Sequence, residues 1–558
     1  KNLLQWNPYS NYRYERKTVR NAYLKMWFSP FLSFATFAYL SVYFPLTIIV
    51  AFPFLIGWLG APFVAWYISL PAPEKKTELS VPQNLYLRSI ARKIWRFFET
   101  FVGPEDNWLP PDNYQEHPVE RIAHRTSPTN IGLSLLANLT ARNFGYITNS
   151  VLIERTTNTV DALMKLEKYH GHLYNWYDTV SLAPLRPKYI STVDSGNFVG
   201  HILILKQALL MLRDEKIIPE KLFDGLLDTL GILLEKAGDT SALKKFKQQL
   251  ENTFPSKVDN MPSLKSYVDE LNISFREILR ELELNPENED DWWAEKITDQ
   301  LNGIKRDIST FLPWLSLPPF PEKFQHLIPH LPTSPTLNHV AKIEELLVQK
   351  IMACFYTGNS DVENEWLNSF KVAIIESARH AKEMLRKIRQ LVIKCTELAN
   401  IEYDFLYDNT QHLLSIGYNA DDHRLDNSFY DLLASEARVT TFIAIAQGKL
   451  PQQSWFALGR QLTNDGTTPI LLSWSGSMFE YLMPLLIMPS YENTLLDQTN
   501  KAVVHKQIEY GKKRGVPWGI SESGYNLLDA NLNYQYRAFG IPGLGFKRGL
   551  GEDLVIAP

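Results

Sequence analysis

The chain has 558 residues, of which 45% are hydrophobic and 21% charged, so it can bury two to four domain cores and is not globally disordered. Its net charge of −4 gives no basic field for a polyanion, which excludes nucleic acid as an expected partner. Two cysteines, Cys354 and Cys395, are too few for a disulfide framework or a four-thiolate zinc site.

The N-terminal region carries no charged residue from Met26 to Pro73. At about 20 residues per span, this run is long enough to cross a bilayer twice as a hairpin, with its turn near Pro45 or Pro53. Basic residues flank both ends, which for two spans predicts that both flanks lie in the cytoplasm. The alternative is a helical pair buried against the rest of the chain or lying in the membrane interface. We therefore expect residues 1–95 to form a membrane-associated helical segment.

The remainder, residues 96–558, is expected to be one all-α domain with a polar helical insertion around 206–340, which is rich in Lys, Glu, Leu and Gln. Helical patterns continue at roughly 427–447, 474–488 and 499–512. Long loops rich in aromatic and carboxylate residues separate them, which predicts an α-helical toroid with its chemistry on the loop face. The sequence begins at Lys1 and ends within an apolar run, so it reads as a piece of a longer protein.

Three glutamates are candidates for chemistry. Glu436 is expected on the apolar face of the helix over 427–447, where desolvation raises the pKa of a carboxyl and suits it to general acid work. A buried ion pair with Arg438 or Arg424 is the structural alternative. Glu480 is expected in a helix that is apolar almost all round, where it would hold ligand hydroxyls or form a buried salt bridge.

Glu522 is the third acid, in a loop marked by Gly519 and Gly524. Its immediate neighbours are small, which gives a bulky ligand access to the carboxylate. Trp518 and Tyr525 bracket it and would form the walls of a sugar subsite. The alternative is an exposed loop acid with no ligand.

Two further loops, over 172–178 and 189–197, combine rings, amides and carboxylates, a mixture that suits polyhydroxylated ligands. Asp194 or Asn197 would alternatively cap a helix that begins near Phe198. Other chemistries are weakly signalled: Ser521 lacks the glycine pattern of a nucleophile elbow, and the few His residues do not cluster like metal ligands. We expect neither a metal nor a cofactor.

Seven motifs taken together resemble the middle region of cyclic β-1,2-glucan synthases: Leu109–Glu116, Arg125–Leu133, Gly171–Thr179, Ser191–Asn197, Asp426–Thr441, Trp474–Pro484 and Gly515–Asn526. The resemblance implies an (α/α)6 barrel that cyclises linear β-1,2-glucan by transglycosylation with retained configuration. It further implies a bacterial inner-membrane enzyme whose catalytic domain faces the cytoplasm. A glycosyltransferase region and a phosphorylase-like region would flank this one in the full-length chain.

Retention requires a nucleophile and an acid/base, with a glycosyl-enzyme intermediate between two transfer steps. We assign Glu522 as nucleophile because its loop is open and polar enough to keep it ionised, and Glu436 as acid/base because its helical face should keep it protonated. A substrate hydroxyl would relay the proton if the kinked linkage keeps Glu436 from the scissile oxygen. Residues expected to bind the substrate are Arg125, Trp176, Tyr177, Asp178, Asp194, Asn197, Trp474, Glu480, Trp518 and Tyr525. The alternatives are a hydrolysing endo-β-1,2-glucanase and a non-catalytic, membrane-anchored glucan-binding scaffold.

Overall fold

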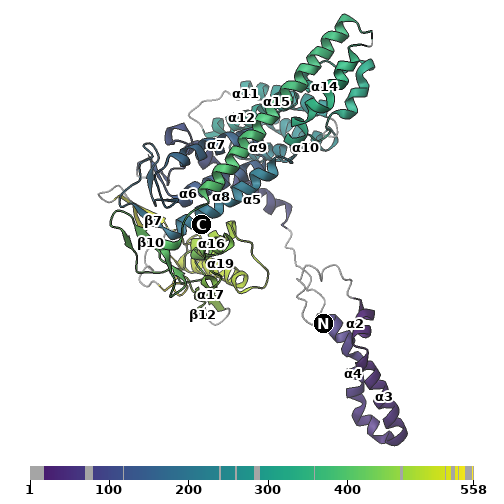
Figure 1. Cartoon of the computed structure of the whole chain (residues 1–558), viewed down its shortest axis with the longest axis vertical. Coiled ribbons are helices and arrows are strands. Elements are labelled where there is room, and N and C mark those ends of the chain that lie inside the picture. The colour runs from purple at the N-terminus through teal and green to yellow at the C-terminus, as the bar shows by residue number, and fades with distance from the viewer. Residues whose placement is uncertain are drawn as a thin grey trace. The chain divides into compact units, whose positions relative to one another are not determined.

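The computed structural model describes residues 18–68, 79–116, 119–237, 240–257, 261–281, 289–356, 358–464, 469–521, 523–528, 534–537, 540–546 and 556. The chain divides into two compact units, residues 1–81 and 82–558 (Figure 1). The boundary expected between residues 95 and 96 falls inside α5 (Val81–Phe101), almost all of which belongs to the second unit.

The first unit is a helical hairpin of α2 (Val19–Lys25), α3 (Phe28–Tyr43), η1 (Pro45–Thr47) and α4 (Ile48–Ile68). The chain turns at Pro45, whereas Pro53 lies inside α4. Hydroxyl groups tie the two long helices together, since Ser33 Oγ donates to the carbonyl oxygen of Leu55 at 2.8 Å. The stretch Pro45–Ile68 has a mean hydropathy of 2.1 and is only 11% buried, so by length and composition it can span a membrane.

The second unit is predominantly helical, which confirms the all-α prediction. Its α-helices after α5 are α6 (Pro128–Phe144), α7 (Asn149–Lys165), α8 (Thr192–Leu212), α9 (Lys221–Ala237), α10 (Ser241–Lys257), α11 (Met261–Glu281), α12 (Glu289–Phe311), α13 (Leu337–Ala341), α14 (Ile343–Cys354), α15 (Asp361–Leu398), α16 (Ala437–Ala446), α17 (Gln453–Ala457), α18 (Met478–Leu482) and α19 (Leu495–Arg514). Helix α8 is also apolar enough to span a membrane, but 61% of it is buried and it forms the centre of this unit (Figure 1).

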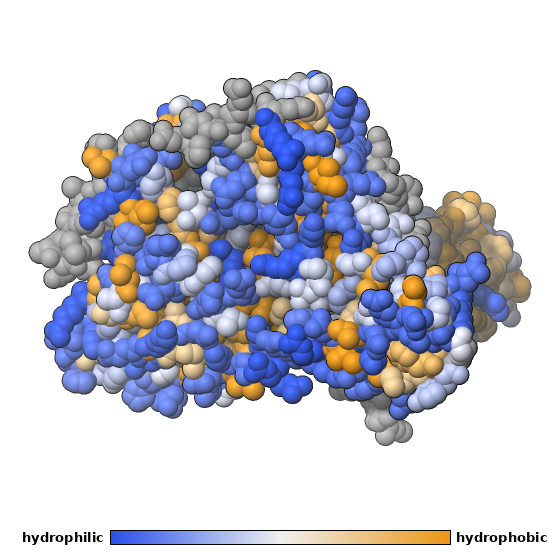
Figure 2. All heavy atoms as spheres, turned by 90° about the horizontal axis from the view of Figure 1, so that it is seen from above, coloured by the Kyte–Doolittle hydropathy of each residue, from blue (hydrophilic) through white to orange (hydrophobic). Residues whose placement is uncertain are grey.

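Short 3-10 turns lie in the connections between the α-helices: η2 (Pro104–Asp106), η3 (Pro313–Ser316), η4 (Glu322–His330), η5 (Asp404–Leu406) and η6 (Met483–Leu486). The face of the molecule in Figure 2 is mostly hydrophilic, with small scattered hydrophobic patches. A solvated outer face was expected for the helices around 206–340, and α10 to α12 do carry polar residues on their exposed side.

Strands are short and lie in the loops between helices. They are β1 (Tyr114–Gln115), β2 (Arg121–Ile122), β3 (Arg125–Thr126), β4 (Lys168–Tyr169), β5 (His172–Leu173), β6 (Tyr177–Asp178), β7 (Tyr189–Ser191), β8 (Tyr407–Asp408), β9 (Leu413–Leu414), β10 (Gly417–Asn419), β11 (Arg424–Leu425), β12 (Leu462–Asn464), β13 (Pro469–Leu471), β14 (Ser523–Leu528) and β15 (Tyr534–Arg537). Antiparallel pairing of β7 with β10 joins the loop before α8 to the segment before α16.

Close packing of α8 against α6 and α16 places these three helices side by side (Figure 1). A Cβ on Gly132 of α6 would lie 2.3 Å from His201 Nδ1, so the imidazole of α8 occupies the space that a side chain would need. A Cβ on Gly196 of α8 would lie 1.9 Å from Thr440 Oγ1 of α16. Glycine is required at both crossings, and it brings the first turns of the three helices together.

Candidate active site

Glu436 lies at the N-cap of α16, one residue before the helix, and not on a helical face as expected for 427–447. The preceding residues leave the helical path because the backbone of Asp431 and Leu433 bonds to Gly459, at 2.5 and 3.0 Å. Ser435 Oγ donates to the carbonyl oxygen of Leu432, which closes a turn immediately before Glu436. The glutamate therefore projects from a helix start and keeps part of its surface exposed.

Four polar side chains from these three helices form one cluster. Asn197 Nδ2 donates to Glu436 Oε2 at 3.0 Å and lies 3.3 Å from Thr129 Oγ1. Thr129 Oγ1 donates in turn to Asp194 Oδ1 at 2.5 Å. Asp194, Asn197 and Glu436 were predicted as site residues and lie together here. Thr129 was missed, because the Ser127–Asn130 stretch also reads as an ordinary helix start.

Helix α8 begins earlier than the expected position near Phe198, with Ser191 as its N-cap, so neither Asp194 nor Asn197 is the cap residue. Asp194 lies in the first turn, where its backbone N–H donates to Ser191 Oγ at 3.3 Å. Burial raises the pKa of the Asp194 carboxyl above its usual range, opposed by hydrogen bonds from Ser191 and Thr129. The polar cluster thus has a carboxylate at each end, Asp194 and Glu436.

Arg438 anchors the start of α16 to α18. Its guanidinium is 2% exposed and donates to the carbonyl oxygens of Glu480 at 3.3 Å and Tyr481 at 2.6 Å. Desolvation lowers the pKa of Arg438 to about 10, at which it stays charged at neutral pH. Arg438 therefore does not form the ion pair with Glu436 that was the structural alternative; it holds helix α18 instead.

Glu480 is buried, and its carboxylate accepts hydrogen bonds from the loop before α18. Its Oε2 accepts from Ser473 Oγ at 2.8 Å, Ser475 Oγ at 2.6 Å and Gly476 N at 3.1 Å. Ser477 and Glu480 also form a capping box at the start of α18. These contacts favour a loop-holding role over the predicted contact with substrate.

The segment that leads to Glu522 is fixed on α18 and α19. Backbone N–H groups of Met478 and Phe479 donate to the carbonyl oxygen of Ile520 and to Ser521 Oγ, both at 3.1 Å. The Gln507 amide bonds both backbone groups of Ile520. Glu522 itself and the side chain of Tyr525 lie outside the described residues.

Two predicted tryptophans in the C-terminal part keep exposed surface. Trp518 is 43% exposed, and a Cβ on Gly511 of α19 would lie 3.0 Å from its Cα, so the backbone of Trp518 packs against that helix. Trp474 is partly buried, packs on the Phe546 ring with centroids 5.8 Å apart and hydrogen-bonds Asp431. Both rings remain candidates for contact with a ligand.

Arg125 and Trp176 lie together near the start of α6. The guanidinium carbon of Arg125 lies 5.2 Å from the centroid of the Trp176 ring, and Arg125 Nε lies 3.8 Å from Asp112 Oδ2. Asp112 also accepts from Asn130 Nδ2 at 3.0 Å, and Asn130 is the neighbour of Thr129. Burial raises the pKa of the Asp112 carboxyl, opposed by Arg125. Asp112 was not predicted, although it lies in one of the quoted motifs.

Tyr177 and Asp178, both predicted to bind substrate, make contacts within the protein. Tyr177 is fully buried, and its hydroxyl donates to the carbonyl oxygen of Glu167 at 2.6 Å, so its ring supports the core. Asp178 Oδ1 accepts from Ser181 N at 2.7 Å and Ser181 Oγ at 2.8 Å, which closes its own turn. Pairing of β3 with β6 places Asp178 opposite Arg125 and Tyr177 opposite Thr126.

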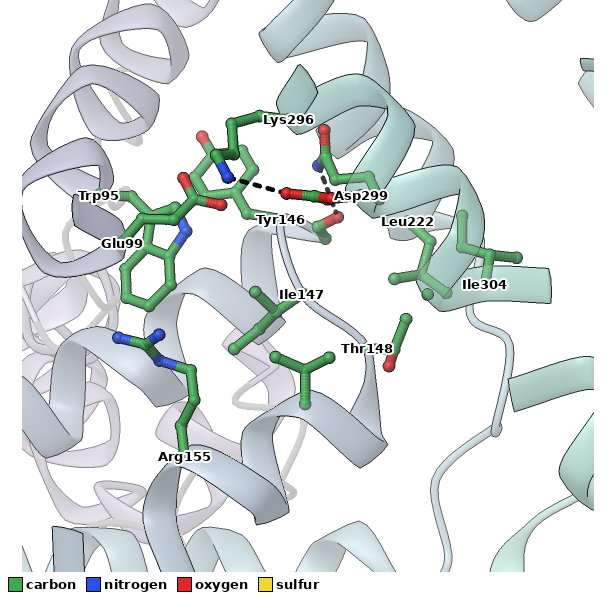
Figure 3. Close-up of a pocket in the computed structure, with 14 residues that line it drawn as sticks. Trp95, Glu99, Tyr146, Ile147, Thr148, Arg155, Leu222, Lys296, Asp299 and Ile304 are labelled. Carbon is green, nitrogen blue, oxygen red and sulfur yellow. Dashed lines mark hydrogen bonds and ion pairs between the residues drawn. The ribbon is translucent and has the colours of Figure 1, made fainter. Parts of the chain in front are cut away.

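A separate cavity of about 240 Å³ lies where α5, α7 and α12 meet. Figure 3 shows the Lys296 amine directed at Asp299, with Trp95, Glu99 and Arg155 gathered on one side of the cavity. None of the predicted site residues lines it. Across the described part of the chain, no group of three or more His, Cys, Asp and Glu side chains is arranged to hold a metal ion.

Comparisons with known proteins agree with the motif resemblance. No protein-family model matches the chain. It is 36% identical over 548 residues to the cyclic beta-(1,2)-glucan synthase NdvB of Rhizobium meliloti (strain 1021), a match that covers 97% of this chain but 18% of that protein. Solved structures with some likeness are an endo-beta-1,2-glucanase from Chitinophaga pinensis (11% identity, 84% of this chain and 76% of that one, TM-score 0.38) and a putative glucoamylase from Bacteroides caccae (10%, 82% and 74%, TM-score 0.37).

Proposed function

We propose that this chain, which is similar along almost its whole length to one segment of a cyclic β-1,2-glucan synthase, cyclises linear β-1,2-glucan by transglycosylation. The observation that carries the proposal is this similarity, together with the cluster in which Thr129, Asn197 and Glu436 meet. Glucan is the substrate, and flanking glycosyltransferase and phosphorylase-like regions of a longer chain are the partners. An (α/α)6 barrel is the architecture that this function implies.

In this proposal Glu522 attacks the anomeric carbon and Glu436 protonates the leaving oxygen, directly or through a substrate hydroxyl. Glu436 then takes the proton from the incoming hydroxyl at the chain's own non-reducing end, and the bond to Glu522 breaks. The reducing-end part of the chain departs as a shorter linear glucan, no water is consumed, and the remainder closes into a ring. Two successive displacements at the anomeric carbon retain its configuration. Support comes from the anchoring of Ile520 and Ser521 on α18, which Arg438 ties to the start of α16.

The proposal includes membrane association through the N-terminal hairpin, at a bacterial inner membrane with the second unit in the cytoplasm. The exposed apolar surface of Pro45–Ile68 supports it. Exposed surface on Trp176, Trp474 and Trp518 supports a groove for glucose units, which ring faces bind well.

Incubation of the chain with linear β-1,2-glucan, followed by mass spectrometry, tests the function. Products lighter by one water, formed without new reducing ends, support cyclisation, whereas linear products alone, with new reducing ends, indicate an endo-glucanase. Glu522→Gln and Glu436→Gln should each abolish product while glucan still binds. Unchanged processing in both variants would exclude these two glutamates as the catalytic residues, and binding without any product in the wild type would leave only a glucan-binding scaffold.

A further inference from the structure

Glu436 has two carboxyl oxygens, and the structure distinguishes them. Oε2 accepts a hydrogen bond from Asn197 Nδ2 at 3.0 Å, and an amide N–H₂ group can only donate. Donation from Asn197 stabilises negative charge on Oε2, which favours Oε1 as the oxygen that carries a proton. An acid/base residue has to present its proton in one direction, so the identity of this oxygen matters for the reaction.

The orientation of the Asn197 amide is itself determined by Thr129. The Thr129 hydroxyl gives its proton to Asp194 Oδ1 at 2.5 Å, so its oxygen is left as the acceptor facing Asn197 at 3.3 Å. A flipped amide would set Asn197 Oδ1 against two acceptors, Thr129 Oγ1 and Glu436 Oε2. The direction of donation thus runs from Asn197 through Thr129 to Asp194.

The backbone around this network is held tightly. Thr129 and Asn197 are 8% and 0% exposed, and the Gly132 and Gly196 crossings leave no space for the helices to shift. The remaining charged or titratable groups on α6, α8, α16 and α18 are Arg142, His201, Lys206, Arg438, Glu480 and Tyr481. Burial leaves His201 neutral, and the contacts of Arg438 and Glu480 are with backbone and hydroxyl groups.

We propose that Thr129 and Asn197 are positioning residues, which use Asp194 as a fixed acceptor to keep the transferable proton of Glu436 on Oε1. The inference rests on the proposed function for the role of Glu436 as acid/base. Asp194 and Asn197 then act behind Glu436 and do not need to contact the sugar. Thr129 likewise does not need to contact the sugar, so a search of the sequence for ligand-binding residues does not select it.

The test compares Thr129→Val, which keeps shape but removes the hydroxyl, with Thr129→Ser, which restores it. We expect a loss of about 10–100-fold in kcat for Thr129→Val with KM little changed, and recovery to within a few-fold in Thr129→Ser. Asn197→Ala removes a donor to the ionised carboxylate, so the pKa of Glu436 and the alkaline limb of the rate profile should move up. Thr129→Val should move that limb in the same direction, but less.

A readout without turnover separates this inference from the proposed function. Carbon-13 NMR of the chain carrying labelled glutamate carboxyls follows Glu436 directly, with its signal assigned by its absence in Glu436→Gln. A raised Glu436 pKa in Thr129→Val, reversed in Thr129→Ser, supports positioning even if wild type forms no cyclic glucan. An unchanged Glu436 titration in both Thr129→Val and Asn197→Ala overturns it, whatever the activity.

Discussion

Arg438 Nη2 lies 2.6 Å from the carbonyl oxygen of Tyr481, and through this bond the start of α16 holds α18. The same guanidinium bonds the carbonyl oxygens of Ser435, at 3.1 Å, and Glu480. Since α18 also carries the backbone groups that hold Ile520 and Ser521, Arg438 connects the segments that lead to the two proposed catalytic glutamates.

Arg438→Met should therefore destabilise the second unit and reduce activity together. Removing the guanidinium leaves several buried carbonyl oxygens without a donor, at a cost of about 3 kcal/mol in the free energy of unfolding. Urea unfolding measures the loss. Arg460→Met is a matched control, because Arg460 bonds carbonyls of its own loop only, and we expect its cost to stay near 1 kcal/mol. Equal costs in the two variants would contradict the connecting role.

Gly196→Ala should be one of the most damaging small substitutions in the chain. The added Cβ would lie 2.6 Å from the Cα of Thr440, a backbone contact that no rotamer change relieves. Overpacking of this kind costs about 3 kcal/mol or more, and it pushes α16 and Glu436 away from Asn197. Gly231→Ala on α9 is the control, since a Cβ there meets nothing within 4 Å and should be neutral or stabilise by up to about 1 kcal/mol. Thermal unfolding of both variants measures the two effects, and equal midpoints would contradict the close packing of α8 on α16.

Asp194 and Asn197 could be selected from the sequence because they lie in a loop motif with mixed polar and aromatic residues, and Glu436 because it is a carboxyl among apolar residues. The position of Glu436 at a helix start could not be predicted, because it depends on the pairing of Asp431 and Leu433 with the distant Gly459. Periodicity describes a helix face, but it does not reveal a competing non-local hydrogen bond.

The contacts of Tyr177 and Asp178 within the protein could not be predicted for a similar reason. A ring and a carboxylate look the same in a sequence whether they face a ligand or close a turn. Pairing of β3 with β6 decides the matter by turning Tyr177 inward and leaving Asp178 to bond Ser181. The helical class and the hairpin were easier to predict, because long apolar and amphipathic runs are local signals.

Glu480→Gln should reduce stability more than glucan affinity. Its carboxylate accepts from several hydroxyl and backbone N–H groups of the loop over 473–477, and an amide nitrogen at that position repels them. We expect a loss of about 2–3 kcal/mol in unfolding free energy, with the dissociation constant for glucan changed less than threefold at a temperature where the variant is folded. A large loss of affinity in a fully stable variant would instead place Glu480 on the substrate.

The buried carboxyl of Asp307 on α12 should make the free energy of unfolding fall as pH rises through the weakly acidic range. Burial raises the pKa of this carboxyl to about 6, opposed by hydrogen bonds from Ser150 and Thr148. Because the folded state holds the proton more tightly than the unfolded chain, the stabilisation is fully present below about pH 4 and is lost as pH rises through 6. The loss is on the order of 2–3 kcal/mol.

Urea unfolding at pH 4.5 and 7.5 measures this dependence. Asp307→Asn stays neutral throughout, so its unfolding free energy should fall by less than that of wild type between the two values. Glu295→Gln, on the exposed side of the same helix, is the control and should follow the wild-type curve. If Asp307→Asn also follows the wild-type curve, the buried carboxyl is not the group responsible.

Removal of residues 1–81 should separate membrane binding from catalysis, since that unit is compact by itself and the second unit has its own core. The hairpin exposes large apolar side chains such as Phe34 at 64%, Ile49 at 77% and Phe54 at 67%, which water solvates poorly. We expect the whole chain to sediment with phospholipid vesicles and the 82–558 fragment to stay in the supernatant while still acting on linear glucan. Sedimentation of both would mean that the second unit carries a membrane-binding surface of its own.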